Sequence, residues 1–312
     1  MSRLEHAIQA GRLVLTAELP SVDGGGLEAV RRHLVRFADW VDAANVTDNP
    51  AAVAHASSIA VAIALAQLGM EPVMQLVSRD RNRLALEAEI VGAALHGIEN
   101  ISSLSGDDVS AGDEPDARRV FDLDSTQLLV TARAISQGCY LSGRRIEPPP
   151  HLFLGAVENP GAPPYDYRVD RALKKARAGA QFLQLQITFD HGRLRAFMAE
   201  AVAKGLDKQV AIMPSICLLR SARALRFMDE NVPGISVPQE LVQRCERAPS
   251  PDEECFEIAC EQAEKALGLP GVRGLHLISF RRDDAIGRLC ERLGIPKRVE
   301  REAGEYRRDI AV

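Results

Sequence analysis

The sequence has no excess of positive charge. Its 38 lysines and arginines are outnumbered by 43 aspartates and glutamates, which gives a formal net charge of -5. Such a chain carries no basic field that would attract a phosphate backbone, so nucleic acid is not an expected partner. The sequence also lacks any apolar run near the ~20 residues that cross a bilayer, and its start, MSRLEHAIQAGR, is typical of an amphipathic helix rather than a signal peptide. We therefore expect a cytoplasmic protein that does not enter membranes.

Patterns typical of metal sites and disulfides are missing as well. None of the six cysteines forms a CxxC pair, and the seven histidines include no HxH or HExxH. We therefore expect no metal site. The expected structural, reduced thiols are Cys139, Cys217, Cys245, Cys255, Cys260 and Cys290. His276, in the middle of an apolar run, is expected to be a hydrogen-bonded histidine of the core.

The sequence does have a regular alternation of short apolar runs with longer stretches of helical period, a pattern typical of a parallel sheet with crossover helices. Eight runs are predicted as strands: 14–19, 40–46, 72–77, 99–104, 151–157, 181–186, 209–214 and 272–279. Predicted helices are 27–38, 51–68, 80–96, 168–178, 191–203, 219–230 and 283–293, with an additional pair at 238–247 and 252–266 before the last strand. Eight strand–helix units in 312 residues predict an α/β fold of the (β/α)₈ TIM-barrel type.

Segment 108–150 is the main irregularity, and it is expected to hold the fourth helix together with an elaborated loop after strand four. We expect residues 1–312 to form one barrel domain that ends in a charged surface tail at about 297–312.

Polar residues gather where the predicted strands end, and this end of a (β/α)₈ barrel carries the chemistry. They are Glu18, Thr47 with Asp48 and Asn49, Gln75 to Asp80, Asp107 with Asp108, and Gln186. Several of them have a structural alternative. Glu18 could pair with a rim arginine, Asp48 or Asn49 could cap a helix that Pro50 begins, and SRDRNR could be a solvated helix start instead of an anion site. In NISSLSGDD, Gly106 permits a close backbone approach, or simply a turn, before Asp107.

Taken in order, these segments resemble the 5,10-methylenetetrahydrofolate reductase family in its bacterial single-barrel form. The resemblance lies in TAELPSVDG, VTDNP, the run from MQLVSRDRNR to SSLSGDD, VFDLDS, GAVENP, KKARAGAQFLQLQITFD and FMDENVPGISVPQELVQR. They cover most of the chain, from about residue 13 to 280. The sequence departs from the family pattern at Gln75, Ser105, Leu185 and Leu218.

The resemblance implies an FAD across the barrel mouth, with NADH or NADPH and a folate reacting in turn at the same flavin face. Glu18 would be the general acid and Asp107 the carboxylate beneath flavin and pterin. Gln186 and Phe189 would contact the substrate. The implied cofactor contacts are Thr47, Gln75, Arg79, Asp107, Asn159 and Lys175, with Lys175 near the phosphates.

The reaction explains these residue types. Hydride can reach the one-carbon unit only after N10 is protonated and the five-membered ring opens to an N5 iminium cation. A carboxylic acid such as Glu18 can supply the proton, and an anionic Asp107 stabilises the cation. Three alternatives stay open at this point: a folate methyltransferase, a barrel that oxidises methyltetrahydrofolate in a demethylation pathway, and a subunit that needs an electron-delivering partner. A homo-oligomer is also possible.

Overall fold

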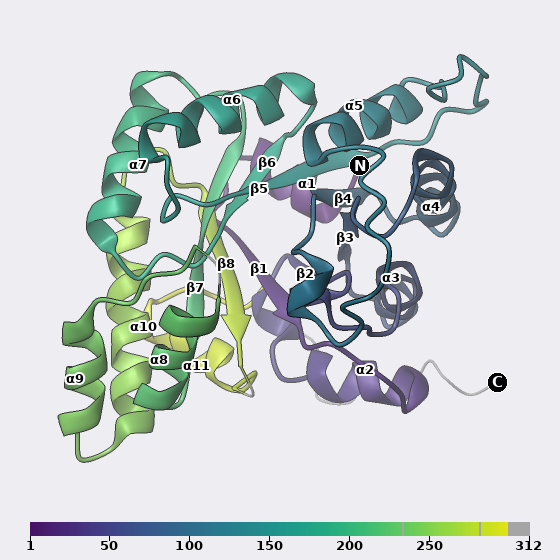
Figure 1. The fold of residues 1–312 in the computed structure, drawn as a ribbon. Coiled ribbons are helices and arrows are strands. Elements are labelled where there is room, and N and C mark those ends of the chain that lie inside the picture. Colours follow the sequence, from purple (N-terminus) through teal and green to yellow (C-terminus); the bar gives the residue numbers. More distant parts are fainter. Residues whose placement is uncertain (233, 281, 299–312) are drawn as a thin grey trace.

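The computed structural model describes residues 1–232, 234–280 and 282–298, and eight parallel strands close into a barrel in the order β1 to β8 (Figure 1). The strands are β1 (Val14–Leu19), β2 (Ala43–Val46), β3 (Pro72–Val77), β4 (Asn100–Leu104), β5 (Phe153–Glu158), β6 (Phe182–Leu185), β7 (Ala211–Leu218) and β8 (Gly274–Ser279). Pairing of β8 with β1 closes the barrel, with His276 opposite Thr16. The predicted (β/α)₈ fold is therefore confirmed.

Helices follow the strands around the outside of the barrel (Figure 1). They are α1 (Arg3–Gln9), α2 (Gly26–Leu34), α3 (Ser58–Gln67), α4 (Arg83–Leu95), α5 (Ser125–Ser136), α6 (Arg168–Ala178), α7 (His191–Ala203), α8 (Ala222–Asn231), α9 (Gln239–Arg247), α10 (Pro251–Leu267) and α11 (Ala285–Arg292). The additional pair predicted before the last strand is α9 and α10, and α5 is the helix predicted within segment 108–150.

Several element boundaries differ from the sequence-based prediction, and the following three affect the strands and the helix nearest the mouth of the barrel. Strand β2 begins at Ala43 rather than residue 40, because Ala38–Trp40 forms a 3₁₀ turn. Strand β7 continues to Leu218, four residues beyond the predicted end at 214. Helix α3 begins at Ser58 rather than residue 51, since Ala51 and Ala52 have φ angles of 54° and 60°, which no right-handed helix accepts.

The floor of the barrel is sealed by α1. Leu4 and Ala7 of this helix pack against Val14 and the stacked rings of Phe153 and Phe182, and all five residues are buried. The barrel is thus filled at one end, so a cavity can lie only toward the other end.

Within the described residues, no helix is both long and apolar enough to cross a membrane. Residues 299–312 of the predicted charged tail lie outside the part of the chain that the structure describes.

Candidate functional site

A cavity of about 160 Å³ lies at the carboxyl ends of the strands. Its lining comes from the ends of β1 to β8 and the loops that follow them: Glu18, Thr47, Asp48, Asn49, Pro50, Gln75, Val77, Leu104, Gly106, Asp107, Val157, Gln184, Leu185, Gln186, Ser215, His276 and Ile278. The structure therefore brings together Glu18, Thr47, Gln75, Asp107 and Gln186, which five separate segments supply. Parallel strands in one barrel place their ends on the same rim, which is why strand-end residues far apart in sequence meet there.

The turn after β4 requires a glycine immediately before Asp107. Gly106 has a φ of 90°, and a Cβ at this position would lie 2.2 Å from Cγ1 of Val77. Only glycine can bring the end of β4 this close to the end of β3. The glycine thereby fixes where the exposed Asp107 carboxylate enters the rim of the cavity.

Two amide side chains present polar atoms to the cavity. Gln75 is 8% exposed and, among the described residues, its amide makes no hydrogen bond. Oε1 of Gln186 accepts a hydrogen bond of 2.9 Å from the N–H of Ile187, which leaves its NH₂ group as the donor on offer. The Gln75 amide is not sealed away from solvent, so it can offer its donor and its acceptor to a polar ligand in the cavity.

Arg79 does not line the cavity, although it lies directly behind the rim. It is 2% exposed, and its guanidinium binds both carboxylate oxygens of Asp80 at 2.7 Å. It also donates to the backbone carbonyls of Asp107 and Asn49. Arg79 therefore ties together the loops after β2, β3 and β4; four of its five N–H donors are engaged and the side chain is buried, so it is poorly placed to bind a phosphate.

Lys175 is also engaged internally. Its ammonium is 5% exposed, lies 3.0 Å from Oε2 of Glu158, and donates to the carbonyl of Val157. Arg168 binds the other oxygen of Glu158 at 3.2 Å. Burial lowers the pKa of Lys175, and the negative charge of Glu158 opposes that shift. The geometry gives no support to a phosphate contact by Lys175, because its ammonium is buried and bound to Glu158. The sequence gave no sign of this buried partner.

Asn159 and Phe189 lie away from the cavity as well. Asn159 links two loops, since its Oδ1 accepts from the N–H of Gly161 and its Nδ2 donates to the carbonyl of Gly234. Phe189 is buried in a core cluster with Leu225 and Ile258, between β6 and the helices around α10. Neither the substrate contact expected for Phe189 nor the flavin contact expected for Asn159 follows from these positions.

The expected hydrogen-bonded core histidine, His276, is confirmed, but sequence reasoning missed the layer of buried polar side chains below the cavity to which it belongs. Thr16, Asn45, Gln184 and His276 are each no more than 3% exposed, and they are joined by hydrogen bonds of 2.8 to 3.2 Å. The signal was present in TAE, NVT and QLQ, where a second polar residue stands two positions before Glu18, Thr47 and Gln186. Residues at i and i+2 of a strand face the same way, so both of each pair point inward.

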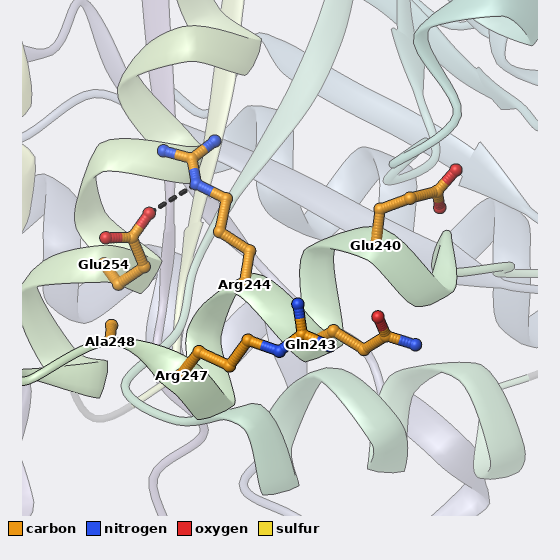
Figure 2. A pocket seen from close by; sticks show the side chains of 6 residues that line it. All are labelled: Glu240, Gln243, Arg244, Arg247, Ala248 and Glu254. Carbon is orange, nitrogen blue, oxygen red and sulfur yellow. Dashed lines mark hydrogen bonds and ion pairs between the residues drawn. The ribbon is translucent and has the colours of Figure 1, made fainter.

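Two other polar clusters lie outside this site. Figure 2 shows the residues of a surface pocket of about 440 Å³ on α9 and the start of α10, with Arg244 paired to Glu254. Arg244 also binds Glu261 by hydrogen bonds of 2.6 and 2.9 Å. This surface pocket is larger than the cavity but does not involve the strand ends, so we place the candidate site at the barrel mouth.

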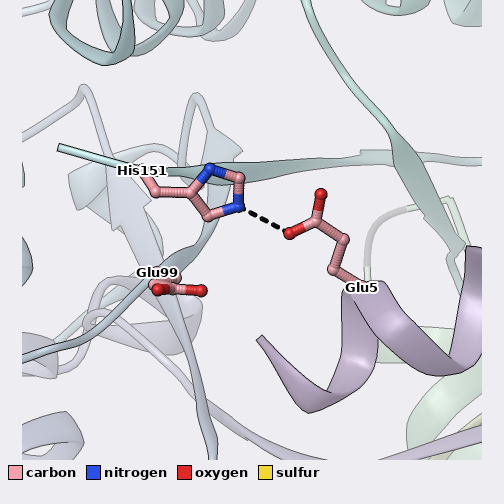
Figure 3. Close-up of side chains that lie close together, drawn as sticks. All are labelled: Glu5, Glu99 and His151. Carbon is pink, nitrogen blue, oxygen red and sulfur yellow. Dashed lines mark hydrogen bonds and ion pairs between the residues drawn. The ribbon is translucent and has the colours of Figure 1, made fainter. Parts of the chain in front are cut away.

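Figure 3 shows Glu5, Glu99 and His151 at the opposite end of the barrel. Glu5 binds His151 at 2.6 Å, and Glu99 lies 3.3 Å from the N-terminal ammonium. These groups are already paired, and they hold α1 against the barrel floor.

The chain was compared with known proteins. The family model described as methylenetetrahydrofolate reductase matches residues 4–294. No curated protein matches the sequence. One solved structure with the same fold is described as an uncharacterized protein from Clostridium thermocellum that binds two copies of 5-methyl-5,6,7,8-tetrahydrofolic acid. The two structures superpose with a TM-score of 0.63 at 13% identity, over 93% of this chain and 97% of that one. Because the family model spans nearly its whole length, the chain belongs to the methylenetetrahydrofolate reductase family.

Proposed function

We propose that this protein reduces 5,10-methylenetetrahydrofolate to 5-methyltetrahydrofolate at the barrel mouth, with NADH or NADPH as the electron source and FAD as the hydride carrier. The observation that carries the proposal is a pair of carboxylates, Glu18 and Asp107, that share one cavity with the amides of Gln75 and Gln186 in a member of this family. A barrel of the same fold that binds 5-methyltetrahydrofolic acid supports a reduced folate as the ligand class.

Glu18 is the group that can give a proton to N10 of the folate. Its side chain is 27% exposed, so it is partly shielded from water and still accessible from the cavity. Among the described residues it makes no hydrogen bond within the protein, and His276 is the nearest charged or titratable partner, at 3.9 Å. A carboxyl group that is not committed to an internal partner is free to exchange a proton with a ligand.

Asp107 contributes electrostatically. An anionic carboxylate at the rim favours the N5 cation that forms when the folate ring opens, and Gly106 and Arg79 hold the backbone from which it extends. The NH₂ of Gln186 and the unpartnered amide of Gln75 can bind the polar edge of a pterin.

The cavity fits the ring of a flavin better than it fits the diphosphate. Val77, Leu104, Val157, Leu185 and Ile278 line the cavity together with these amides, which suits a flat ring with a polar edge. When bound, FAD would supply the hydride that NADH or NADPH has delivered to it.

The phosphate end has no comparable support. The basic residues behind the rim are all paired with carboxylates: Arg79 with Asp80, Arg81 with Asp48, Lys175 with Glu158. We therefore assign no contact with the diphosphate of FAD to these three side chains.

Anaerobic stopped-flow spectroscopy of the wild-type protein tests the proposal. The protein is loaded with FAD, mixed with NADH or NADPH, and then mixed with methylenetetrahydrofolate. We expect the visible absorbance of the oxidised flavin to bleach in the first step and to return in the second. A flavin that bleaches only with an added partner protein would favour the partner-dependent alternative, and a flavin that only methyltetrahydrofolate bleaches would favour the oxidative one.

A further inference from the structure

The buried layer beneath the cavity is unusual for the interior of a (β/α)₈ barrel, which branched apolar residues normally fill. Here Thr16, Asn45, Gln184 and His276, on β1, β2, β6 and β8, are buried and hydrogen-bonded to one another. Burying four polar side chains costs free energy unless each finds a partner. All four do, so the layer is a connected network with a defined orientation.

The amide groups of Asn45 and Gln184 set which atoms donate and which accept in this network. Asn45 and Gln184 form a reciprocal pair, with Nδ2 of Asn45 donating at 2.8 Å and Nε2 of Gln184 donating back at 3.0 Å. Nε2 of Gln184 also lies 3.0 Å from Oγ1 of Thr16 and 3.2 Å from Nδ1 of His276. The Thr16 hydroxyl is then the donor to Nδ1 of His276, at 2.8 Å.

This direction sets the tautomer of the histidine. Because Nδ1 accepts a hydrogen bond, the proton of the neutral ring is on Nε2. Nε2 lies 3.9 Å from Oε2 of Glu18, two residues above Thr16 on the same strand. A small rotation of the partly exposed Glu18 side chain would bring its carboxylate into hydrogen-bond range.

We infer that His276 is a positioning residue for Glu18: the Asn45–Gln184–Thr16 network fixes its ring so that the Nε2–H always points at the Glu18 carboxylate. This inference rests on the proposed function. During the reaction the proton moves from a carboxyl oxygen of Glu18 to N10 of the folate, and His276 keeps its own proton. Its N–H stabilises the carboxylate that is left behind and holds it toward the cavity.

Other titratable groups around Glu18 do not offer this donor. Among the described residues, the cavity also contains the carboxylates of Asp48 and Asp107, and Asp48 is bound by both terminal nitrogens of Arg81. Cys217 on β7 is influenced by the charge of Glu18, but burial raises the pKa of this thiol, which therefore stays neutral. Among the titratable groups of the described residues that line this cavity, His276 is the one that can present an N–H to Glu18.

Two substitutions separate the two sides of the imidazole. Asparagine places its amide near the position of Nδ1 and glutamine near that of Nε2, so His276→Asn keeps the network side and His276→Gln keeps the donor to Glu18. We expect His276→Asn to slow folate reduction about 10- to 100-fold, as loss of a group that orients a functional side chain typically does. His276→Gln should recover most of that loss, and His96→Asn, an exposed position on the outside of the barrel, serves as the matched control.

The pH profile of folate reduction distinguishes positioning from a structural role. Without the N–H donor, Glu18 holds its proton more tightly, so the descending limb of the profile in His276→Asn should move up by about one pH unit. A lower rate with an unmoved limb, or His276→Gln no better than His276→Asn, would overturn the inference.

A measurement that needs no activity tests the same geometry. The ¹⁵N chemical shifts of the histidine side chains report which ring nitrogen carries the proton, and His276→Asn identifies the resonance. We expect His276 to be protonated on Nε2, and Thr16→Val to reduce that preference. Protonation on Nδ1 would contradict the inference. If the wild-type protein reduced no methylenetetrahydrofolate, the proposed function would fail while the tautomer result still decided the geometry.

Discussion

At the scale of single residues, the site depends also on residues that take no part in the reaction and act by fixing the backbone. Gly106 is the clearest. Its φ of 90° and the Val77 side chain beside it leave no room for a Cβ, so the backbone of the turn and the placement of Asp107 depend on this one residue.

We predict that Gly106→Ala destabilises the protein by about 1–3 kcal/mol, because a Cβ must displace Val77 or the β4 turn. Both half-reactions should slow, since Asp107 moves with the turn. Denaturant unfolding and stopped-flow kinetics measure the two effects. Gly143→Ala is the control: it has a φ of 85° but no atom within 4 Å of an added Cβ. Equal losses in the two variants would show that backbone strain alone, and not the contact with Val77, is responsible.

At the scale of elements, ion pairs hold the loops and helices around the mouth. Glu158 at the end of β5 binds Lys175 and Arg168 of α6, and all three are buried. These two ion pairs hold α6 against the end of β5, in the region where the family resemblance implied a cofactor contact.

We predict that Lys175→Met lowers the free energy of unfolding by about 3 kcal/mol, because Glu158 loses a buried partner. The loss should be reduced in Lys175→Met/Glu158→Gln. Lys204→Met is the control, since Lys204 makes only solvent-exposed pairs with Asp170 and Glu200, which water and salt screen. If Lys175→Met unfolded like the wild type and instead released FAD on dialysis, Lys175 would serve the cofactor.

The elaborated loop after β4 is anchored in the same way. Asp122 accepts a hydrogen bond of 2.8 Å from the backbone N–H of Arg83, the first residue of α4, and binds its guanidinium. The Arg83 contacts lower the pKa of Asp122 to about 2.

The pH dependence of this anchor has a definite sign. A carboxyl group with a lowered pKa stabilises the folded state above its unfolded value near 3.8, and the contribution is lost as pH falls toward about 2. We predict that Asp122→Asn raises amide hydrogen exchange in residues 105–124 at pH 7, with Asp116→Asn in the same loop as control. Peptic cleavage of the wild-type loop should rise between pH 4 and pH 2. Exchange unchanged by Asp122→Asn would show that other contacts hold the loop.

At the scale of the whole molecule, the barrel and the location of its mouth could be predicted from sequence because both follow from local patterns. Eight apolar runs alternate with helical segments, and parallel strands bring their ends to one rim. Glu18, Thr47, Gln75, Asp107 and Gln186 meet there for that reason.

Contacts between distant segments could not be predicted in the same way. One example is the ion pair of Lys175 with Glu158. Another is the set of hydrogen bonds that joins Thr16, Gln184 and His276. Both depend on strand register and barrel closure, which no local pattern specifies. Phe189 follows β6 as the resemblance required, but packing with the helices around α10 draws it into a separate core cluster.

The most direct test of the central claim, that Glu18 gives the proton at N10, is stopped-flow kinetics of Glu18→Gln in each half-reaction. Glutamine keeps the size of the side chain but has no carboxyl proton to release. Flavin reduction by NADH should stay within roughly tenfold of the wild-type rate, while methylenetetrahydrofolate reduction should fall by ~10²–10⁴, as loss of a general acid predicts. Methylenetetrahydrofolate reduction at the wild-type rate would contradict the account and assign the proton to Asp107 or to water.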